Sequence, residues 1–578
     1  MAETIISPGV FTRENDLSFV QPAPTAIGTL FVGPTVKGPV EVPTAVTSYG
    51  QYQRLFGTTF TSGSTKQEFL TSIAVRNFFR QGGGTALVTR VVSGSFTSAT
   101  STDITASAVN DTSFTLATLG EGVLYNNSTG AGDAGSENSD NSLVSGSADN
   151  LRWEVSNVNN SKGTFTLSIR RGDDSNKEKV VLETFTDLSL DEESPNFIAR
   201  RIGNQVQSLS GDSTYVQVTG EYPNRSNYVR VVSVDLPTTR YLENDGTTVR
   251  EDGNGVSYSG SLPLVGSGSF YGATGDVVTG GDTYYNGFTA NNIQGLEPAN
   301  YNNVITLLGN SDDYQFNVIT APGLNAADHA TQVNSFISLA ETRGDCIFIV
   351  DMGDYGDSVS TVAGTADGLN SSYAATYYPF LQVATETGKN EFVPPSVLIP
   401  GVYAANDNSS APWFAPAGLT RGGIPGVLQA ERKLSKANRD TLYSSKINPI
   451  ATFPGSGISV LGQKTLQTRA TALDRVNVRR LLIELKNFFS QQARNLLFEQ
   501  NTIATRNRFL AAVNPYLESV VQRQGLYAYR VVMDDTNNTA DVIDRNQLVG
   551  QVFIQPSKTA EFIVLDFTVQ PTGASFDV

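Results

Sequence analysis

The pattern of apolar and polar positions changes character several times along this chain of 578 residues. Residues 25–93 and 301–400 alternate short apolar runs with amphipathic stretches, which is the rhythm of an α/β fold. The expected strands are Thr25–Gly33, Ala86–Val92, Asn317–Gly323 and Cys346–Asp351, the last almost entirely apolar like an interior parallel strand. The expected helices are Ser48–Gly57, Gln67–Phe79 and Ala326–Arg343, followed by a helix at Tyr373–Phe380 and a strand at Ser396–Pro400.

Residues 94–300 have a different pattern, in which short strands are separated by Ser, Thr, Gly, Asn and Asp. One helix is expected near Asn196–Ser208, and Gly120–Asn150 is expected to be a long polar loop. This profile predicts one or two β-rich, solvent-facing modules inserted in a surface loop of the core. The expected strands are Ser113–Leu119, Leu151–Val158, Thr164–Arg170, Lys179–Thr186, Tyr215–Val218 and Tyr228–Val234.

The C-terminal part contains the strongest helical pattern and three strand candidates. Asp474–Glu499 carries apolar residues at three- and four-residue spacing. The strand candidates are Gly525–Asp535, Leu548–Pro556 and Ala560–Pro571, rich in β-branched and aromatic residues. The last is so hydrophobic that it would promote aggregation if left unpaired. It must therefore pair with its own sheet or with a neighbouring chain.

These patterns predict a mixed α+β, multidomain fold. Its α/β core is built from N- and C-terminal segments and carries β-rich inserted domains and extended terminal arms. The expected parts are an N-terminal arm (1–24), the first part of the core (25–93), the outward-facing insertion (94–300), the second part of the α/β core (301–400), a C-terminal core with a basic inner helix (401–556) and a C-terminal arm that is donated as a strand (557–578).

Charge and residue usage exclude several classes of function. The net charge of −16 argues against general nucleic-acid binding. A single cysteine, Cys346, and a single histidine, His329, leave no disulfide framework and no Cys- or His-rich metal site, so we expect no metal and no cofactor. Residues Met1–Thr4 lack the features of a secretory signal, and no apolar window is long enough to span a membrane. These features predict a protein made in a cytoplasm-like compartment.

Three local features have both a chemical and a structural interpretation. Asp351 ends an apolar strand, where a metal ligand or catalytic acid can lie, but no His, Cys or Gly-rich partner follows, so turn and cap carboxylates are favoured. Gly82–Gly84 follows a helix, which favours a turn over a phosphate cradle. Between Arg469 and Arg508, eight Lys or Arg residues oppose three Asp or Glu residues. This excess indicates either a solvated helix face or a basic face that meets an acidic partner.

Several motifs follow one another in an order that is typical of one family. They are Ser7–Glu14, Ile27–Gly33 with Gly38-Pro39, Phe56-Gly57, Trp413–Gly418 with Arg421-Gly422, Asn448–Ile450 with Ser456–Ile458 and Leu461–Leu466, Arg475–Leu481, and finally Tyr529–Asp534 with Phe562–Val569. Together they resemble the contractile-tail sheath proteins of bacteriophages, although Val460-Leu461 stands where many members have a Trp. The resemblance covers residues 1–93 and about 301–578, and 94–300 corresponds to the variable insertions of this family.

The resemblance implies a structural protein without an active site. Sheath subunits polymerise as stacked hexameric rings around a tail tube and contract to drive the tube through the host envelope for genome delivery. The implied partners are further copies of the chain, the tail tube protein, and baseplate and tail terminator proteins, with no direct contact to nucleic acid and no membrane insertion. The implied location is the tail of the virion, assembled in the host cytoplasm.

The resemblance also implies roles for particular residues. Terminal arms add strands to the sheets of neighbouring subunits, which would explain how the hydrophobic terminal strand is covered. The residues expected in strand addition are Val10, Phe11, Thr12, Arg13, Phe562, Val564, Asp566 and Thr568, and Gly525–Pro556 is the expected hairpin of the subunit's own core. The basic residues expected to face the tube are Arg475, Arg479, Arg480, Lys486 and Arg494.

Three alternatives remain open. The first is a sheath of a non-phage contractile injection system, such as a bacteriocin-like particle. The second is an α/β enzyme that uses Asp351 and His329, for which the sequence shows no nucleophile elbow, phosphate loop or metal cluster. The third is a surface-layer or adhesin protein, which would explain the β-rich middle but not the α/β core.

Overall fold

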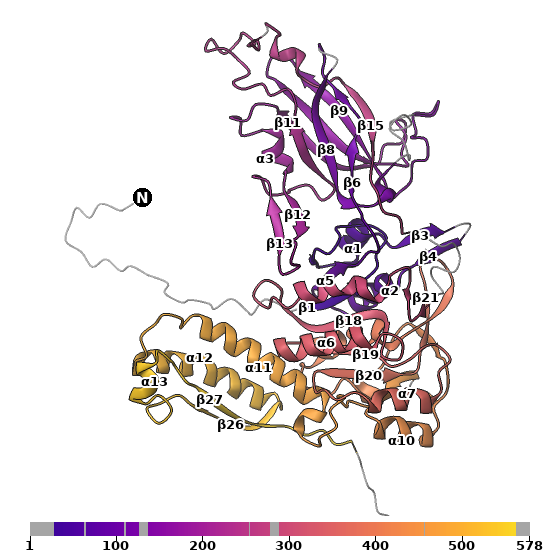
Figure 1. Cartoon of the computed structure of the whole chain (residues 1–578), viewed down its shortest axis with the longest axis vertical. Coiled ribbons are helices and arrows are strands. Elements are labelled where there is room, and N and C mark those ends of the chain that lie inside the picture. The colour runs from indigo at the N-terminus through magenta and orange to yellow at the C-terminus, as the bar shows by residue number, and fades with distance from the viewer. Residues whose placement is uncertain are drawn as a thin grey trace, which may run out of the picture.

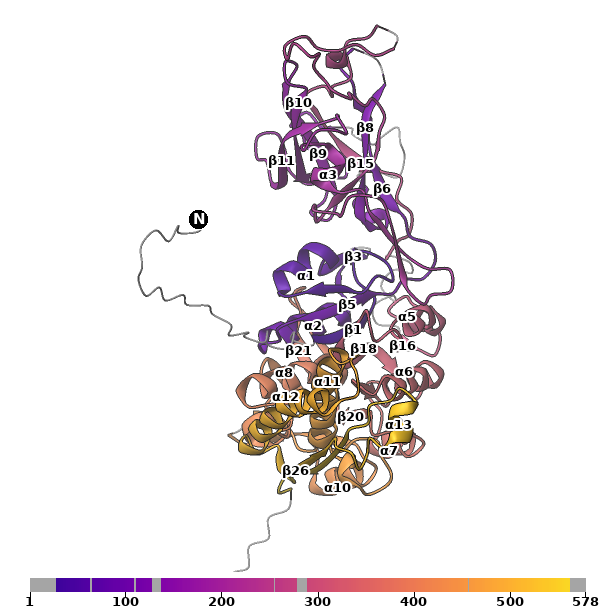
Figure 2. The same cartoon turned by 90° about the vertical axis from the view of Figure 1, so that its left-hand side faces the viewer.

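A computed structural model describes residues 28–62, 65–108, 111–126, 137–253, 255–277, 288–455 and 457–561. The molecule is elongated, with a β-rich part at one end, an α/β core in the middle and two long helices with a hairpin at the other end (Figures 1 and 2). The fold is therefore mixed α/β and multidomain, as the sequence predicts.

The core is an eight-stranded sheet with the strand order β2-β5-β1-β18-β19-β20-β24-β25. Adjacent strands from β5 to β24 run parallel, and β2 and β25 add antiparallel at the two edges. The strands are β1 (Gly28–Gly33), β2 (Thr44–Val46), β5 (Ala86–Arg90), β18 (Phe316–Asn325), β19 (Ile347–Asp351), β20 (Ala374–Tyr378), β24 (Asn448–Phe453) and β25 (Gly457–Val460). Two distant segments, 28–90 and 316–460, thus build one sheet.

Successive residues of each strand point to opposite sides of the sheet, so both faces carry apolar side chains and helices cover both of them. Leu30, Phe348 and Val350 face a core formed with α5 (Asn302–Leu307), α6 (Ala330–Arg343), α7 (Val359–Asp367) and α10 (Lys436–Ser444). Phe31, Ile347 and Ile349 face the other core, formed with α1 (Tyr49–Phe56), α2 (Leu70–Arg80), α8 (Ile399–Ser409) and the start of α11 (Val476–Arg494).

The insertion forms its own antiparallel sheet, β11-β10-β9-β15-β6-β8-β14, with β7 beside β8. Its core contains Phe114, Trp153, Phe165 and Leu167 together with α3 (Ile198–Ile202). The strands are β6 (Ser98–Ser101), β7 (Ile104–Thr105), β8 (Thr112–Glu121), β9 (Leu151–Asn159), β10 (Thr164–Arg171), β11 (Val181–Ser189), β14 (Val229–Val234) and β15 (Gly266–Tyr271). The predicted β-rich character of this region is confirmed.

The C-terminal unit consists of α11, α12 (Ile503–Gln522), the strands β26 (Leu526–Val532) and β27 (Gln551–Pro556), and α13 (Ala540–Asp544). Three short strand pairs lie elsewhere: β3 (Thr59–Ser62) with β4 (Thr65–Glu68), β12 (Val206–Leu209) with β13 (Val216–Thr219), and β16 (Phe288–Thr289) with β17 (Asn292–Ile293). A small sheet contains β21 (Leu381–Ala384), β22 (Asn390–Val393) and β23 (Val427–Ala430), and α9 is the short helix Gly418–Arg421. The 3₁₀ turns are Val123–Tyr125, Tyr258–Gly260, Pro298–Tyr301, Pro395–Val397 and Ala472–Asp474.

The predicted helix-then-strand step at Tyr373–Phe380 and Ser396–Pro400 is wrong in both parts. Residues 374–378 are strand β20, because the run Ala-Ala-Thr-Tyr-Tyr is buried throughout and pairs with β19 and β24. Ser396 lies in a 3₁₀ turn that leads into helix α8, whose first turn contains Pro400. Proline suits a first helical turn, because its missing N–H group would have no partner there.

The predicted helix at Asn196–Ser208 is shorter in the structure and ends at Ile202. Gly203 follows with a positive φ of 109°, and a Cβ atom at this position would lie 2.3 Å from the Cα atom of Asn224. A residue with this backbone conformation stops a helix, and only glycine adopts it without strain. The chain then turns into β12.

Candidate subunit interface

The predicted hairpin in Gly525–Pro556 is confirmed as the antiparallel pair β26 and β27, with Tyr529 opposite Ile554 and Val531 opposite Val552. These four side chains pack against a cluster that α11 and α12 supply, including Leu481, Phe509, Val513 and Leu517. The cluster anchors a two-stranded sheet that would be marginally stable alone.

The described residues supply no strand partner for either outer edge of this hairpin. Within the described part of the chain, β26 and β27 pair only with each other. Along β27 the residues alternate between half-buried and exposed, and the outward side chain of Phe553 is 56% exposed, as is 66% of Tyr527 on β26. Unpaired N–H and C=O groups beside exposed apolar side chains make this hairpin suitable for the addition of further strands.

The segment that follows the hairpin is held by a carboxylate clasp around Glu561. The Arg475 guanidinium donates two hydrogen bonds to the Glu561 carboxylate, at 2.7 and 3.0 Å, and the Tyr443 hydroxyl donates a third at 2.7 Å. Gln463 Nε2 donates a fourth at 3.1 Å. Burial would raise the pKa of Glu561, but these donors together lower it. The clasp therefore fixes the chain at the last residue before 562–578.

Tyr443 and Gln463 were not among the residues for which the sequence predicted a role. Two features of the sequence bear on these residues. Glu561 is a single acid at the beginning of an apolar run, which indicates that it needs hydrogen-bond donors, and Gln463 lies in the segment Gly462–Lys464 of a family motif. The expected strand-addition residues Val10, Phe11, Thr12 and Arg13, and likewise Phe562, Val564, Asp566 and Thr568, lie outside the described residues.

The five basic residues that were expected to face a tube have different environments. Arg475 belongs to the clasp, and the Arg479 guanidinium lies 3.9 Å above the ring of Tyr373. Arg480 forms an ion pair with Asp407 and lies over Tyr403. Lys486 donates to the hydroxyl of Tyr373 at 3.0 Å, and Arg494 pairs with Asp312 at 2.7 Å.

Burial corrects part of this expectation. Arg479 and Arg480 are each only 4% exposed, so they cannot form an outward basic face. Their aliphatic stems and guanidinium groups join the start of α11 to the aromatic rings of the core. Burial lowers the pKa of Arg479. For Arg480 burial is the largest single cause and also acts to lower the pKa, but the charge and hydrogen bond of Asp407 together with Tyr403 and Tyr377 outweigh it and raise the pKa. Lys486 and Arg494 are exposed, so their position on the surface agrees with the expectation without testing it.

The residues of the enzyme alternative form internal hydrogen bonds. Both carboxylate oxygens of Asp351 accept hydrogen bonds from Ser396, one from its backbone N–H at 3.1 Å and one from its hydroxyl. His329 Nδ1 accepts from the backbone N–H of Asn325 at 3.2 Å, and Nε2 lies 3.1 Å from the carbonyl of Thr289. Both side chains join loops at the ends of β18 and β19. Across the described residues, no three His, Cys, Asp or Glu side chains are arranged to hold a metal ion.

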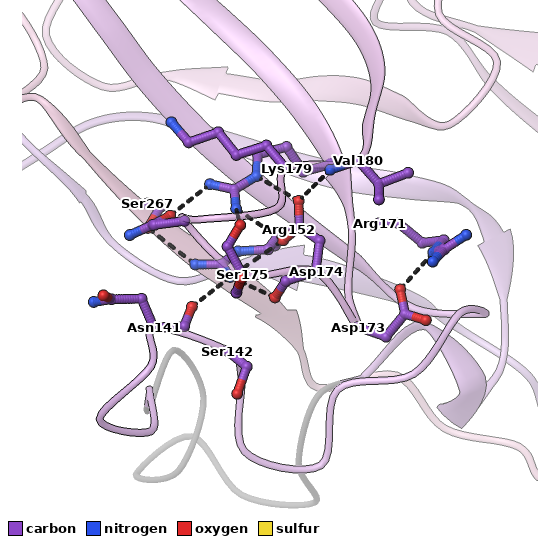
Figure 3. A network of polar contacts seen from close by, with 12 residues as sticks. Asn141, Ser142, Arg152, Arg171, Asp173, Asp174, Ser175, Lys179, Val180 and Ser267 are labelled. Carbon is purple, nitrogen blue, oxygen red and sulfur yellow. Dashed lines mark hydrogen bonds and ion pairs between the residues drawn. The ribbon is translucent and has the colours of Figure 1, made fainter.

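A second polar cluster lies inside the insertion (Figure 3). Arg170 donates to both oxygens of Asp174, at 2.7 and 2.8 Å, and Arg152 forms ion pairs with Asp174 and with Glu137. The side chains of Arg152, Arg170 and Asp174 are fully buried. Because these charges are paired and hydrogen-bonded, the cluster attaches the loops around residues 137–150 and 172–180 to β9 and β10. Its arrangement indicates a structural role.

No helix in the described residues is long and apolar enough to cross a membrane. Comparison with known families shows that residues 295–466 match the phage tail sheath protein central domain and residues 468–570 match the phage tail sheath C-terminal domain.

Curated relatives and a solved structure agree with these matches. The tail sheath protein of Vibrio phage KVP40 is 35% identical over 261 residues, which are 41% of this chain and 39% of that protein. The tail sheath protein of Enterobacteria phage T4 is 36% identical over 225 residues, which are 39% of this chain and 33% of that protein. The matched region thus spans two fifths or less of the length of these two relatives.

The crystal structure of a sheath tail protein from Listeria innocua is similar in fold. It has 12% identical residues and a TM-score of 0.52, and the similarity covers 92% of this chain and 95% of that one. Residues 295–570 thus match the central and C-terminal domains of phage tail sheath proteins, and this part of the chain is similar to curated tail sheath proteins of phages.

Proposed function

We propose that this chain is a subunit of a contractile sheath, which polymerises as stacked hexameric rings around a tail tube and contracts to drive the tube through a host envelope. The observation that carries the proposal is the hairpin β26–β27, which is anchored on α11 and α12 and whose two outer edges pair with no other strand among the residues that the structure describes. Tail sheath proteins are structural components of phage tails, and an open hairpin is a feature of assembly rather than of catalysis.

Strand addition explains how subunits can slide without separating. An added strand forms main-chain hydrogen bonds that each contribute only about 0.5–1.5 kcal/mol net. Several such bonds along one arm give a firm attachment, while the residues between the arm and the subunit body act as a hinge. The Glu561 clasp supports this arrangement, because it fixes the last described residue of the chain on the body of the subunit. We propose that these residues and the N-terminal arm 1–24 are donated to neighbouring copies.

The shape of the molecule supports a radial arrangement in the sheath. The insertion and the hairpin lie at opposite ends of the long axis (Figures 1 and 2). We propose that the insertion faces outward and that the C-terminal unit faces the tube, with Lys486 and Arg494 among the exposed cations that meet it. Exposed ion pairs are weak and screened by salt, so such a contact can release during contraction.

The domain division follows from the same proposal, with one change from the expected bounds: β24 and β25 belong to the core sheet, so the α/β core extends to residue 460. The arms 1–24 and 557–578 connect subunits, 25–93 and 301–460 form the core, 94–300 forms the outer part and 461–556 forms the inner part. Contraction proceeds from a metastable extended state to one with greater burial between subunits. Baseplate and tail terminator proteins are the proposed partners at the two ends of the sheath, and assembly takes place in the host cytoplasm.

Removal of residues 562–578 tests this function. We expect the truncated chain to remain a folded, soluble monomer that forms no tubes or rings, because its own hairpin and clasp are intact. Electron microscopy, sedimentation and the melting temperature measure the outcome. A variant that lacks only residues 573–578 is the matched control and should assemble. Assembly of the longer truncation, or loss of its folded structure, would contradict the proposal.

A further inference from the structure

A cavity of about 500 Å³ lies at the carboxyl ends of the parallel strands of the core, where β18 and β19 stop. The order of the strands reverses between β1 and β18, since the chain leads from β1 to β5 on one side and later to β18 on the other. Open α/β sheets bind ligands outside the carboxyl ends of their strands at such a reversal. The strand ends contribute Gly323, Asn325 and Asp351 to the lining, and Leu70, the first residue of α2, also lines the cavity.

Gln294 supplies this cavity with a hydrogen-bond donor that has no acceptor. Its side chain lines the cavity and is fully buried. The Oε1 atom accepts a hydrogen bond from the backbone N–H of Leu70 at 3.1 Å, whereas Nε2 has no acceptor among the residues that the structure describes. The contact with Leu70 fixes which end of the amide is the carbonyl, because only an oxygen accepts from an N–H group. A buried donor without an acceptor is unfavourable, and an oxygen atom of a ligand at this position satisfies it.

The charged side chains of the cavity are acidic. Asp351, Asp354 and Glu391 line it, and no described residue of the lining is Lys, Arg or His. The Asp354 carboxylate accepts a hydrogen bond from the neutral amide of Asn325 at 2.9 Å, and Glu391 forms no ion pair with any residue that the structure describes. Burial, followed by the hydrogen bond and the charge of Asp328, raises the pKa of Asp354 to about 6. A cation bound beside these groups is therefore favoured, because it stabilises their ionised forms.

Aromatic rings form another wall of the cavity. Tyr355, Phe380 and Phe392 line it, and the ring centre of Tyr355 lies 6.0 Å from that of Phe380 and 4.9 Å from that of Phe392. The side chain of Tyr355 is 57% exposed, so this wall borders the solvent. The faces of aromatic rings attract organic cations, above all quaternary ammonium groups. Rings beside carboxylates thus favour an organic cation as the ligand.

We propose that this cavity binds a small organic cation that carries an oxygen acceptor, of the amino-alcohol class. The ammonium group lies beside the carboxylates of Asp354 and Glu391 and against the ring of Tyr355, and the oxygen accepts a hydrogen bond from Gln294 Nε2. The volume of the cavity lies in the range of small-molecule sites. This assignment is independent of the proposed sheath function, since neither the hairpin nor the clasp contributes a residue to the cavity.

Three related probes test the class of ligand on the full-length wild-type chain at pH 8, which is above the pKa of Asp354. Choline carries both the charge and the hydroxyl group, 3,3-dimethyl-1-butanol is its neutral counterpart, and tetramethylammonium lacks the hydroxyl. By calorimetry and saturation-transfer NMR, choline should bind about tenfold more tightly than the neutral alcohol and about threefold more tightly than tetramethylammonium. Equal affinities for choline and the neutral alcohol, or no binding of choline at millimolar concentration, would overturn the proposal.

Two substitutions place the bound choline in this cavity. Asp354→Asn keeps an oxygen that can accept from Asn325 and removes the charge, so it should weaken choline binding about tenfold. Tyr355→Leu removes the exposed ring and should weaken binding about threefold. The matched controls are Glu178→Gln and Tyr215→Leu, which change the same kinds of group on the surface of the insertion and should have no effect. Unchanged affinity in both Asp354→Asn and Tyr355→Leu would place choline elsewhere and overturn the site.

Gln294→Met tests the contact with the oxygen atom. In this variant choline should bind no more tightly than tetramethylammonium, because the amide that distinguishes the two probes is absent. Both probes are compared on the same variant, so the lost acceptor of the Leu70 N–H affects them equally. The melting temperature verifies that the variant is folded. A preference for choline that persists in Gln294→Met would overturn the placement of the oxygen.

The outcomes for the cavity are separate from those for the sheath function. Tubes that form from a chain without affinity for choline remove the ligand and leave the sheath function intact, whereas choline binding by a chain that forms no tubes has the opposite meaning. If assembly displaced choline, a cationic side chain of a neighbouring copy would occupy the cavity, and the small-molecule assignment would be overturned.

Discussion

Two carboxylates show how the environment of a side chain decides its protonation. Asp351 lies fully inside the core, where burial outweighs the two hydrogen bonds from Ser396 and raises its pKa to about 7. Glu561 is half-buried, and Tyr443, Arg475 and Gln463 together outweigh burial and lower its pKa. The number and charge of the donors make the difference, since Glu561 has a guanidinium partner and Asp351 has none.

The raised pKa of Asp351 predicts that its ionisation destabilises the core. Between its ordinary value of 3.8 and about 7, the native carboxyl binds more protons than the unfolded one, so the free energy of unfolding falls as pH rises through this range. Asp351→Asn removes this penalty and should gain stability relative to the wild type from pH 4 to pH 8, by an amount on the order of 4 kcal/mol at most. Urea unfolding at several pH values measures the difference.

Ser396→Ala is the matched variant, since it removes the hydroxyl donor and keeps the carboxyl. It should increase the pH dependence, because Asp351 then loses a group that stabilises its ionised form. A constant difference between wild type and Asp351→Asn across pH would show that Asp351 does not titrate in this range. Unchanged assembly of Asp351→Asn is expected, because the side chain lies in the core of the subunit.

For the basic residues at the start of α11, the sequence predicted their charge but could not predict whether their side chains are exposed. The motif Arg475–Leu481 indicated a basic helix face, and the structure places Arg479 and Arg480 inside the molecule. Their burial depends on Tyr373, Tyr403 and Asp407, which are more than 70 residues away in the chain and meet them only through the fold. For the same reason the sequence could not predict the clasp, because its members Tyr443, Arg475 and Glu561 come from three separate segments and meet only in the fold.

At the scale of elements, periodicity predicted well where apolar positions follow a regular pattern. The Ser48–Gly57 helix is confirmed as α1, where the Ser48 hydroxyl accepts a hydrogen bond from the N–H of Gln51, and the Ala326–Arg343 prediction corresponds to α6. The Asp474–Glu499 pattern predicted α11 but not the second helix α12, which contains Pro515. Proline usually ends a helix, but α12 continues past it, and residues on both sides of it, Val513 and Leu517, are buried in the cluster with α11 and β26.

The hairpin gives a prediction that separates folding from assembly. Phe553→Ser changes an exposed side chain and should alter the free energy of unfolding by only about 0.5 kcal/mol or less. It should nevertheless slow tube formation severalfold, because Phe553 would lie beside the side chains of an added strand. Light scattering and electron microscopy measure assembly, and urea unfolding measures stability.

Two controls complete this test. Gln555→Ser is on the same exposed face of β27 and should affect neither property. Leu517→Ala removes a fully buried side chain beneath the hairpin and should cost about 2–5 kcal/mol of stability. If Phe553→Ser assembled at the wild-type rate, the outward face of β27 would not be the surface that accepts strands as proposed.

At the scale of the whole molecule, the core and the insertion are separate structures joined at one place. The core sheet takes all its strands from 28–90 and 316–460, and the inserted sheet takes all its strands from 98–271. The changed composition at residue 94 indicated this division, but it could not show that a strand from the first segment and one from the second lie side by side as β1 and β18. Such long-range pairing is set by packing on both faces of the sheet.

The chain enters and leaves the insertion at neighbouring positions, which predicts that the insertion can be removed. The backbone N–H of Thr97 donates to the carbonyl of Thr274 at 3.1 Å, and their hydroxyl groups lie 3.0 Å apart. Replacing residues 98–273 by a short Gly-Ser linker should therefore leave a folded core that still forms tubes, because the hairpin, the clasp and both arms remain. Loops that join adjacent chain ends cost little entropy to close.

The deletion also removes contacts between the insertion and the core, and the free energy of unfolding that they contribute decides whether the core stays folded. Arg90 loses the carbonyl of Glu121 as an acceptor and keeps that of Gly38 at 2.7 Å, while the Val40 N–H loses the Glu121 carboxylate. Loss of these two acceptors should lower the free energy of unfolding of the core by about 1–3 kcal/mol in total. The loss stays this small because both donors then lie near the new surface, where water can accept their hydrogen bonds. Thermal melting with tube formation by microscopy measures the result. A deletion variant that fails to fold, while the isolated insertion 98–273 also fails to fold, would show that the two sheets depend on each other.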